Sequence, residues 1–229
     1  MRLIVWPLGR GGMALRLHRG GRFRTWLGER FGGGYELGDR LWRRVLHVVA
    51  AVALLYYALP NDFFVIAPKL YVLLAALAAV YVLEALRHVA GLELPTIRPY
   101  EEGRVGSFAL FGTAVVLAIV FFPMPIACAV VLGTAVADPV AGELRREPKY
   151  RYLDAAGPFA VYGALAFLGL AVVGDWPTVP SVGLALLASA IAVAVERPKV
   201  WWVDDDIVMT LVPALVLYGL GVVALGYGR

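Results

Sequence analysis

Three consecutive carboxylates, Asp204, Asp205 and Asp206, stand at the start of the last apolar segment of the sequence. Adjacent like charges repel one another, so such a run persists either in full contact with water or around a cation. Carboxylate oxygens suit hard ions such as Mg²⁺, which is usually held by one or two carboxylates together with waters and substrate phosphates. The same residues also suit a helix N-terminus, where acidic side chains cap the first turn. Residue type alone leaves the metal site and the acidic cap equally open.

Asp138 lies inside another apolar segment. An ionised carboxylate at membrane depth costs several kcal/mol unless it has a partner. Thr134 stands one helical turn earlier on the same face, and Pro139 frees a backbone carbonyl that can join a polar site. We therefore expect Asp138 to be functional and to share a divalent cation with the carboxylates at 204–206. The alternative is an interfacial carboxylate that reaches water.

The connection at 143–155 carries four cations, Arg145, Arg146, Lys149 and Arg151. Arginine can bind a polyphosphate through two-pronged hydrogen bonds and lysine can bind it as a point charge. Basic residues also mark the cytoplasmic connections of membrane proteins whatever their function. The connection therefore indicates a nucleotide site only in combination with the neighbouring carboxylates.

Several common chemistries have no support in the sequence. It contains no GxxxxGK[ST] loop, no GxGxxG, no HExxH and no CxxC pair. His18, His47 and His88 fall in separate segments, and the single Cys128 lies in an apolar one. A zinc centre, a serine hydrolase and a disulfide framework are therefore not indicated.

The composition indicates that lipid surrounds these residues. Of the 229 residues, 61% are hydrophobic and 17% are charged, and the mean hydropathy is +0.75. A soluble domain is less apolar and has about a quarter of its residues charged. The apolar residues come in blocks of roughly 20, the length that a helix needs to cross a bilayer. We therefore expect an all-α bundle of about seven transmembrane helices, at 43–59, 64–88, 105–122, 124–142, 156–174, 179–195 and 206–226.

Lysine and arginine are distributed unevenly between the two sides of these expected spans. They are dense before the first span and in the longer connections at 89–104, 143–155 and 196–205, and absent from the short turns. The positive-inside rule then places the N-terminus in the cytoplasm and the C-terminus outside. The domain at 41–229 would span the cell membrane or the endoplasmic reticulum, with its polar chemistry facing the cytoplasm. The basic, amphipathic arm at 1–40 is expected at the headgroup layer rather than on nucleic acid, because it directly precedes a span.

Four stretches, taken in order, resemble the CTP-dependent polyprenol kinase family, which includes dolichol kinase and the phytol and farnesol kinases. They are Arg43-Arg44-Val-Leu-His47, Glu101-Glu102-Gly-Arg104 with Gly112, Asp138-Pro-Val-Ala141-Gly142, and Asp204-Asp205-Asp206 with Thr210. The resemblance runs from about residue 40 to residue 215. The sequence departs from the family pattern at Asp206, where the family usually has Asn, and at Thr210, where it has Pro. At 151–155 a Lys-Ser-x-Glu-Gly segment of the family is reduced to one cation and one acid.

The resemblance implies transfer of the γ-phosphoryl group of CTP to the hydroxyl of an isoprenoid alcohol dissolved in the bilayer, with Mg²⁺ or another divalent cation as cofactor. The catalytic residues it implies are Asp138, Asp205, Arg44 and His47. The residues it implies for the nucleotide are Arg145, Arg146, Lys149, Arg151, Glu102 and Arg104. The metal ligands it implies are Asp138, Asp204, Asp205 and Asp206.

Two other functions stay open at the level of sequence. A CDP-lipid synthase, which transfers a cytidylyl group to a lipid phosphate, would use similar carboxylates, metal and CTP, but its long Lys- and Ser-containing signature is missing. A small-solute transporter or a structural membrane protein is also compatible with the apolar composition. However, the clustered charges all fall on one side, which leaves no acidic relay through the bilayer.

Overall fold

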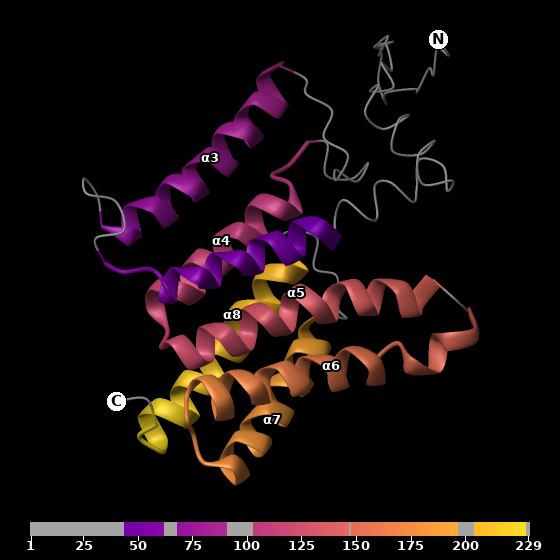
Figure 1. Ribbon diagram of the computed structural model, residues 1–229. Coiled ribbons are helices and arrows are strands. Elements are labelled where there is room, and N and C mark those ends of the chain that lie inside the picture. The colour runs from indigo at the N-terminus through magenta and orange to yellow at the C-terminus, as the bar shows by residue number, and fades with distance from the viewer. Residues whose placement is uncertain (1–43, 62–67, 91–102, 147, 197–203, 228–229) are drawn as a thin grey trace.

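A computed structural model describes residues 44–61, 68–90, 103–146, 148–196 and 204–227 (Figure 1). These ranges are helical and contain no strand. The all-α fold expected from the sequence is therefore confirmed for this part of the chain. The arm at 1–40 lies outside the described residues.

The chain passes back and forth through seven helical segments within the described ranges (Figure 1). The first is Arg44–Tyr57, which ends in the 3-10 stretch η1 (Val52–Tyr57). It is followed by α3 (Lys69–Ala90), α4 (Ser107–Phe121), α5 (Met124–Arg146), the short 3-10 helix η3 (Pro148–Leu153), α6 (Ala156–Phe167), α7 (Thr178–Glu196) and α8 (Asp205–Leu217). Two π-helical stretches, η4 (Leu168–Val173) and η5 (Tyr218–Ala224), continue α6 and α8.

Five of these segments are long and apolar enough to cross a membrane. They are Lys69–Ala90, Met124–Arg146, Ala156–Val173, Thr178–Glu196 and Asp205–Ala224. The segments Arg44–Tyr57 and Ser107–Phe121 are also apolar but shorter. The bounds of these seven segments agree with the ranges predicted from hydropathy to within a few residues. The largest differences are at the start of α3 and at the end of α5.

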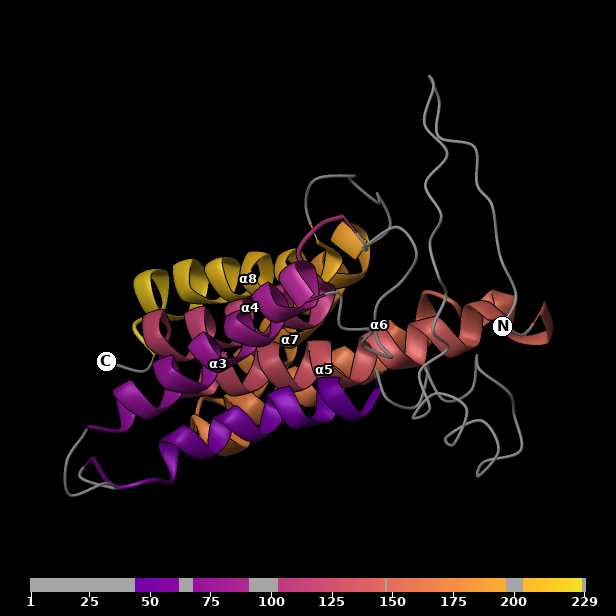
Figure 2. The ribbon, with the colours of Figure 1, turned by 90° about the horizontal axis from the view of Figure 1, so that it is seen from above.

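Helix α5 forms the centre of the bundle and α3 forms its edge. α5 buries eleven residues and packs most extensively against α6 and α8. α3 buries only Leu73, Glu84 and Arg87 and contacts mainly α4. Figures 1 and 2 show the same arrangement, in which α5 and α6 run side by side and extend beyond the other helices.

Small residues bring α5 and α6 close together. A Cβ added at Gly133 would lie 2.8 Å from the ring of Tyr162, and one at Gly169 would lie 2.6 Å from the backbone nitrogen of Ala129. Neither contact leaves room for a side chain. Close backbone approach through glycine is the usual way in which membrane helices gain packing energy.

Two buried hydroxyl groups connect α8 to its neighbours. Pro213 lacks the N–H that would bond the carbonyl of Met209 within the helix, and the hydroxyl of Tyr162 donates to that carbonyl at 3.1 Å instead. The hydroxyl oxygens of Thr210 and of Thr134 on α5 lie within hydrogen-bond distance, at 3.1 Å. These bonds fix α8 against α5 and α6 just below its acidic first turn.

Charged residues gather at one end of the bundle. Successive helices alternate in direction, so the start of Arg44–Tyr57, the end of α3, the start of α4, the end of α5, the end of α7 and the start of α8 lie at the same end (Figure 1). Within the described ranges, Lys69 and Asp175 are the only charged residues at the opposite end. The bundle is therefore polar at one end and apolar along its length.

The polar end differs in one respect from the sequence expectation. α5 continues to Arg146, so Glu143, Arg145 and Arg146 stand on its last turns, and η3 occupies much of the remaining connection. Hydropathy places the end of a span at the first charged residues. A helix can continue past that point into water, because charged residues such as Glu and Arg are good helix formers.

Candidate functional site

Three side chains from three helices converge at the polar end. Nε2 of His47 lies 3.4 Å from Oδ2 of Asp138 on α5 and 3.4 Å from Oδ1 of Asp206 on α8. One ligand atom from each residue lies within 4.8 Å of the other two. His47 and Asp206 are buried, whereas Asp138 is partly exposed. We call His47, Asp138 and Asp206 the histidine–aspartate cluster.

The imidazole of His47 is oriented by an aromatic contact. Its ring stacks on Phe111 of α4, with centroids 4.8 Å apart and an interplanar angle of 23°. Phe111 is fully buried in the hydrophobic core, so the ring has a fixed surface to lie on. Nε2 is left facing the two carboxylates.

The acidic run at 204–206 both caps α8 and contributes to the cluster. Oδ1 of Asp204 accepts a hydrogen bond from the backbone N–H of Asp206 at 3.1 Å, which is an N-cap bond. The side chain of Asp206 meanwhile faces His47. Oxygens of Asp204, Asp205 and Asp206 also lie within 4.8 Å of one another. The two interpretations of this run, cap and ligand, therefore apply to different residues of it.

Thr134 and Thr210 lie one helical turn from Asp138 and Asp206, on the side of the cluster that faces the apolar part of the bundle. Thr210 donates to the backbone carbonyl of Asp206 at 2.8 Å, and both threonines are fully buried. Thr134 stands one turn before Asp138, as the sequence spacing predicted. Pro139 lies within α5 without ending the helix.

An ion pair between a buried carboxylate and a partly exposed arginine lies beside the cluster. Nη1 of Arg145 on α5 is 2.6 Å from Oε1 of Glu196, the last residue of α7. Glu196 is only 1% exposed, and a carboxylate at a helix C-terminus is disfavoured by the helix dipole, so this position depends on the arginine. Arg145 also interacts electrostatically with Asp138 and Asp154. Sequence reasoning missed Glu196, because it stood at the edge of a basic connection and looked solvated.

A second ion pair, with both partners buried, fixes the start of α4. Arg87 of α3 donates to both carboxylate oxygens of Glu84, at 3.0 and 2.6 Å, and to the carbonyl of Arg104 at 2.6 Å. Glu84 accepts in addition from the backbone N–H of Gly106 at 2.8 Å, and His88 Nε2 lies 3.3 Å from it. Sequence reasoning also missed Glu84. An acid three residues before a base inside an apolar segment was the available signal.

The remaining predicted site residues are placed as follows. Arg44 forms an ion pair with Glu143 across the mouth of the cluster. Asp205 interacts electrostatically with Glu196. Arg146 and Lys149 are exposed, and the Lys149 ammonium lies 5.5 Å from the ring of Tyr150. Arg151 is part of η3, the backbone of Arg104 contacts Arg87, and Glu102 lies outside the described residues.

The cluster has the donors of a divalent-cation site. Asp138 and Asp206 offer two carboxylate oxygens from different helices, which is the protein contribution that Mg²⁺ usually receives beside a substrate phosphate. The imidazole can either add a nitrogen ligand, which favours transition metals, or hydrogen-bond to a substrate. Arg145 adds a fixed positive charge on the same helix as Asp138. A divalent cation, a phosphate group and the hydroxyl of a substrate can thus all be bound within this one small region.

Comparison with known proteins returned no match. No protein-family model matches the chain, and neither a curated protein nor a solved structure matches it.

Proposed function

We propose that the chain is a multi-pass membrane kinase that transfers the γ-phosphoryl group of CTP to the hydroxyl of an isoprenoid alcohol. The observation that carries this proposal is the convergence of His47, Asp138 and Asp206 at the polar end of an otherwise apolar bundle. Phosphoryl transfer needs little covalent chemistry from the protein. It needs positioned reactants and compensation of the phosphate charge, and these residues can supply both.

Asp138 and Asp206 would hold a divalent cation, Mg²⁺ in the first instance. The ion would offset charge on the phosphates of the nucleotide. Asp204 caps the helix that carries Asp206, and Asp205 adds negative charge beside it. Because Asp138 and Asp206 belong to different helices, binding the cation also stabilises the packing of α5 against α8.

His47 is assigned to the acceptor alcohol. Its stacking on Phe111 holds Nε2 toward the carboxylates, where it can hydrogen-bond to a hydroxyl that approaches the phosphate. Arg145 is assigned to the triphosphate, with Glu196 holding its guanidinium in place. Arg146, Lys149 and Arg151 follow on the same polar end and are assigned to the outer phosphates.

The expected membrane arrangement suits two substrates of opposite solubility. In this proposal all seven helical segments cross the bilayer and the charged end faces the cytoplasm. The uneven distribution of Lys and Arg supports this orientation. CTP then reaches the cluster from water, and the alcohol reaches it from the bilayer.

A double-label assay tests the proposal. Purified protein in lipid nanodiscs receives Mg²⁺, a prenol or a lipid phosphate, and CTP labelled at either the α or the γ position. The kinase predicts γ label in a prenyl phosphate and none from the α position. Transfer of α label into lipid, with release of pyrophosphate, would instead establish a CDP-lipid synthase. Absence of both products across a full panel of lipids would refute an enzymatic function with CTP.

A further inference from the structure

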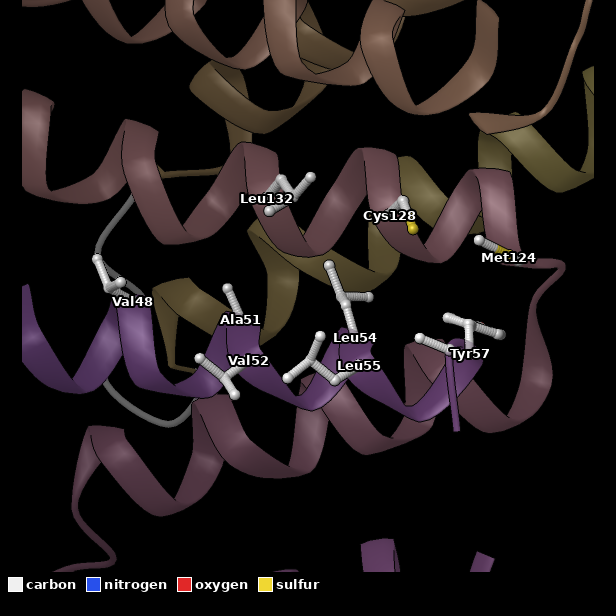
Figure 3. A pocket seen from close by; sticks show the side chains of 10 residues that line it. Val48, Ala51, Val52, Leu54, Leu55, Tyr57, Met124, Cys128 and Leu132 are labelled. Atoms are coloured by element: carbon white, nitrogen blue, oxygen red, sulfur yellow. The ribbon is translucent and has the colours of Figure 1, made fainter. Parts of the chain in front are cut away.

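An apolar groove runs between the helix Arg44–Tyr57 and α5 (Figure 3). Its volume is about 530 Å³ and its lining contains no charged side chain. The lining residues are Val48, Ala51, Val52, Leu54, Leu55, Tyr57, Ala58, Met124, Cys128 and Leu132. Figure 3 shows these side chains between the two helices, with Val48 and Leu132 toward one end and Tyr57 and Met124 at the other. We call this feature the lipid groove.

One end of the lipid groove lies near the depth of the histidine–aspartate cluster, because the same two helices carry both. Val48 directly follows His47 in the sequence, and Leu132 lies within two helical turns of Asp138 on α5. The two helices that form the walls of the groove therefore carry two members of the cluster. A molecule lying in the groove would have one end at the same depth in the bundle as His47.

The far end of the groove offers no polar group to a ligand. The hydroxyl of Tyr57 donates to the backbone carbonyl of Ile119 on α4 at 3.1 Å, so its hydrogen atom is already used. Met124 completes this end with a flexible thioether. The groove thus becomes apolar throughout as it leaves the cluster.

The length of the groove matches one leaflet of a bilayer. From Val48 to Ala58 the rise amounts to about 18 Å, because Val52–Tyr57 is a 3-10 helix, and this is a little more than half of a hydrocarbon core of ~30 Å. A chain that follows the groove from the polar end would reach the middle of the membrane. Beyond that point a longer chain would leave the protein and enter lipid.

The charged residues at the polar end indicate which polar group a molecule bound in the lipid groove can carry. Two carboxylates face His47, and the nearby Arg44 is already paired with Glu143. A neutral hydroxyl can hydrogen-bond there to the imidazole or to a carboxylate, and no unpaired basic group among the cluster residues is left to hold a charged headgroup. The groove and its mouth together fit an amphiphile with a single neutral polar end.

We propose that the lipid groove binds the hydrocarbon chain of the acceptor alcohol, with the hydroxyl at His47 and the chain between Arg44–Tyr57 and α5. This inference rests on the proposed function for the role of its occupant. The inference adds where the hydrocarbon chain of the alcohol lies and how much of that chain the protein contacts. Alcohols should gain affinity with chain length until the groove is full and should gain little beyond it.

Photo-crosslinking locates the chain without requiring catalysis. The probe is a farnesol analogue with a diazirine on its terminal isoprene unit, irradiated with the full-length protein in nanodiscs and mapped by peptide mass spectrometry. We expect adducts within 48–58 and 124–132, and we expect excess unlabelled farnesol to remove them. Adducts on the exposed face of α3, for example at Val82, serve as the control for bulk lipid and should not be competed. Adducts that farnesol does not displace, or that spread evenly over all outer faces, would overturn the proposal.

Chain-length selection gives an independent test. Ala58→Phe fills the far end of the groove, and Ala75→Phe makes the same change on the exposed face of α3. Ala58→Phe should raise the KM for farnesol and geranylgeraniol about tenfold, the factor expected when about two methylene groups lose their burial. The KM values for CTP and for the shorter geraniol should stay unchanged, and Ala75→Phe should change none of them. An equal loss for all three alcohols, or no loss for any, would contradict a chain in the groove.

The two tests separate this inference from the proposed function. Competed adducts in the groove without any phosphorylated alcohol would leave the lipid site standing and refute the kinase. Phosphorylated alcohol with adducts elsewhere would leave the kinase standing and refute the groove.

Discussion

A single ring nitrogen of His47 lies equally close to two carboxylates from different helices. This arrangement needs a precise ring orientation, and the core side chain of Phe111 provides it. Asp138 and Asp206 bring charge of the same sign to one point, which is unfavourable unless a cation or a proton compensates it. The electrostatic cost of placing these two carboxylates together is expected if the arrangement serves to bind a cation.

The orientation of His47 is testable through Phe111. Phe111→Leu keeps a similar apolar volume but removes the stacking surface, so we expect kcat to fall about tenfold because the acceptor is less well positioned. The KM for CTP should change little, and the thermal midpoint should fall modestly because a few buried carbons are lost. Phe121→Leu, on the exposed far end of α4, is the control. An unchanged kcat in Phe111→Leu would show that stacking does not matter for turnover.

Sequence alone named the residues of the cluster among a larger set of candidates, which also included Asp205 and Arg44, but it did not name all of their partners. Asp138 was a candidate because an ionised carboxylate inside an apolar segment is costly. Asp206 was a candidate because it belongs to a run of three acids, and His47 because it belongs to a stretch that resembles a known family. Glu84 and Glu196 were not, because an acid next to a basic connection is usually solvated. Their burial follows from how α3 meets α4 and how α7 meets α5, and only the tertiary structure contains that information.

At the scale of elements, the ion pair between Glu84 and Arg87 holds the junction between α3 and α4. Glu84→Gln leaves Arg87 buried without its counter-charge and should lower the free energy of unfolding by about 3 kcal/mol. Glu143→Gln breaks the exposed pair with Arg44 and should cost at most about 1 kcal/mol. Unfolding followed by circular dichroism in detergent compares the two variants. Equal costs would mean that the junction does not depend on this pair.

Glycine sets the distance between α5 and α6. Gly133→Ala would force a methyl group into the ring of Tyr162, and overpacking of this kind costs about 1–3 kcal/mol. Gly142→Ala, on the same helix with nothing nearby, should be neutral or slightly stabilising. The thermal midpoints of the two variants give the comparison. A Gly133→Ala protein as stable as Gly142→Ala would rule out the close packing described for these helices.

The ranges of the helices were largely predictable because apolar length and turn residues determine them. The end of α5 was not, since hydropathy stops at the first charges whereas the helix continues to Arg146. The π-helical ends of α6 and α8 were not predicted either. They coincide with close contacts between helices, such as Gly169 against Ala129 and Gly221 against Trp176, which no local pattern encodes.

For the whole molecule, the separation of charge between the two ends leads to a topology prediction. In a Cys128→Ala background, Tyr150→Cys should react with a membrane-impermeant maleimide only after the cells are permeabilised. Asp175→Cys, at the opposite end, should react in intact cells. Both positions are exposed, so access depends only on the side of the membrane. The reverse pattern of labelling would invert the proposed orientation.

The assembly of the site is the part that sequence could least provide. Residues 47, 138 and 206 are far apart in the chain and meet because three packed helices, Arg44–Tyr57, α5 and α8, bring their ends to one place. Periodicity gives the face of each helix, but it does not give the order in which the helices surround α5. The polar end was predictable from charge counting, and the identity of neighbours within it was not.

The most direct test of the central claim is the rate of γ-phosphoryl transfer from CTP to a prenol in three matched variants. Asp138→Asn and Asp206→Asn each remove one carboxylate from the cluster without changing its shape, and Asp175→Asn makes the same change at the opposite end. We predict that the first two lose at least about 100-fold in rate, as expected when a charge-stabilising group is removed, while remaining folded, and that Asp175→Asn keeps the wild-type rate. Near-normal transfer at low Mg²⁺ in either cluster variant would contradict the assignment of this site.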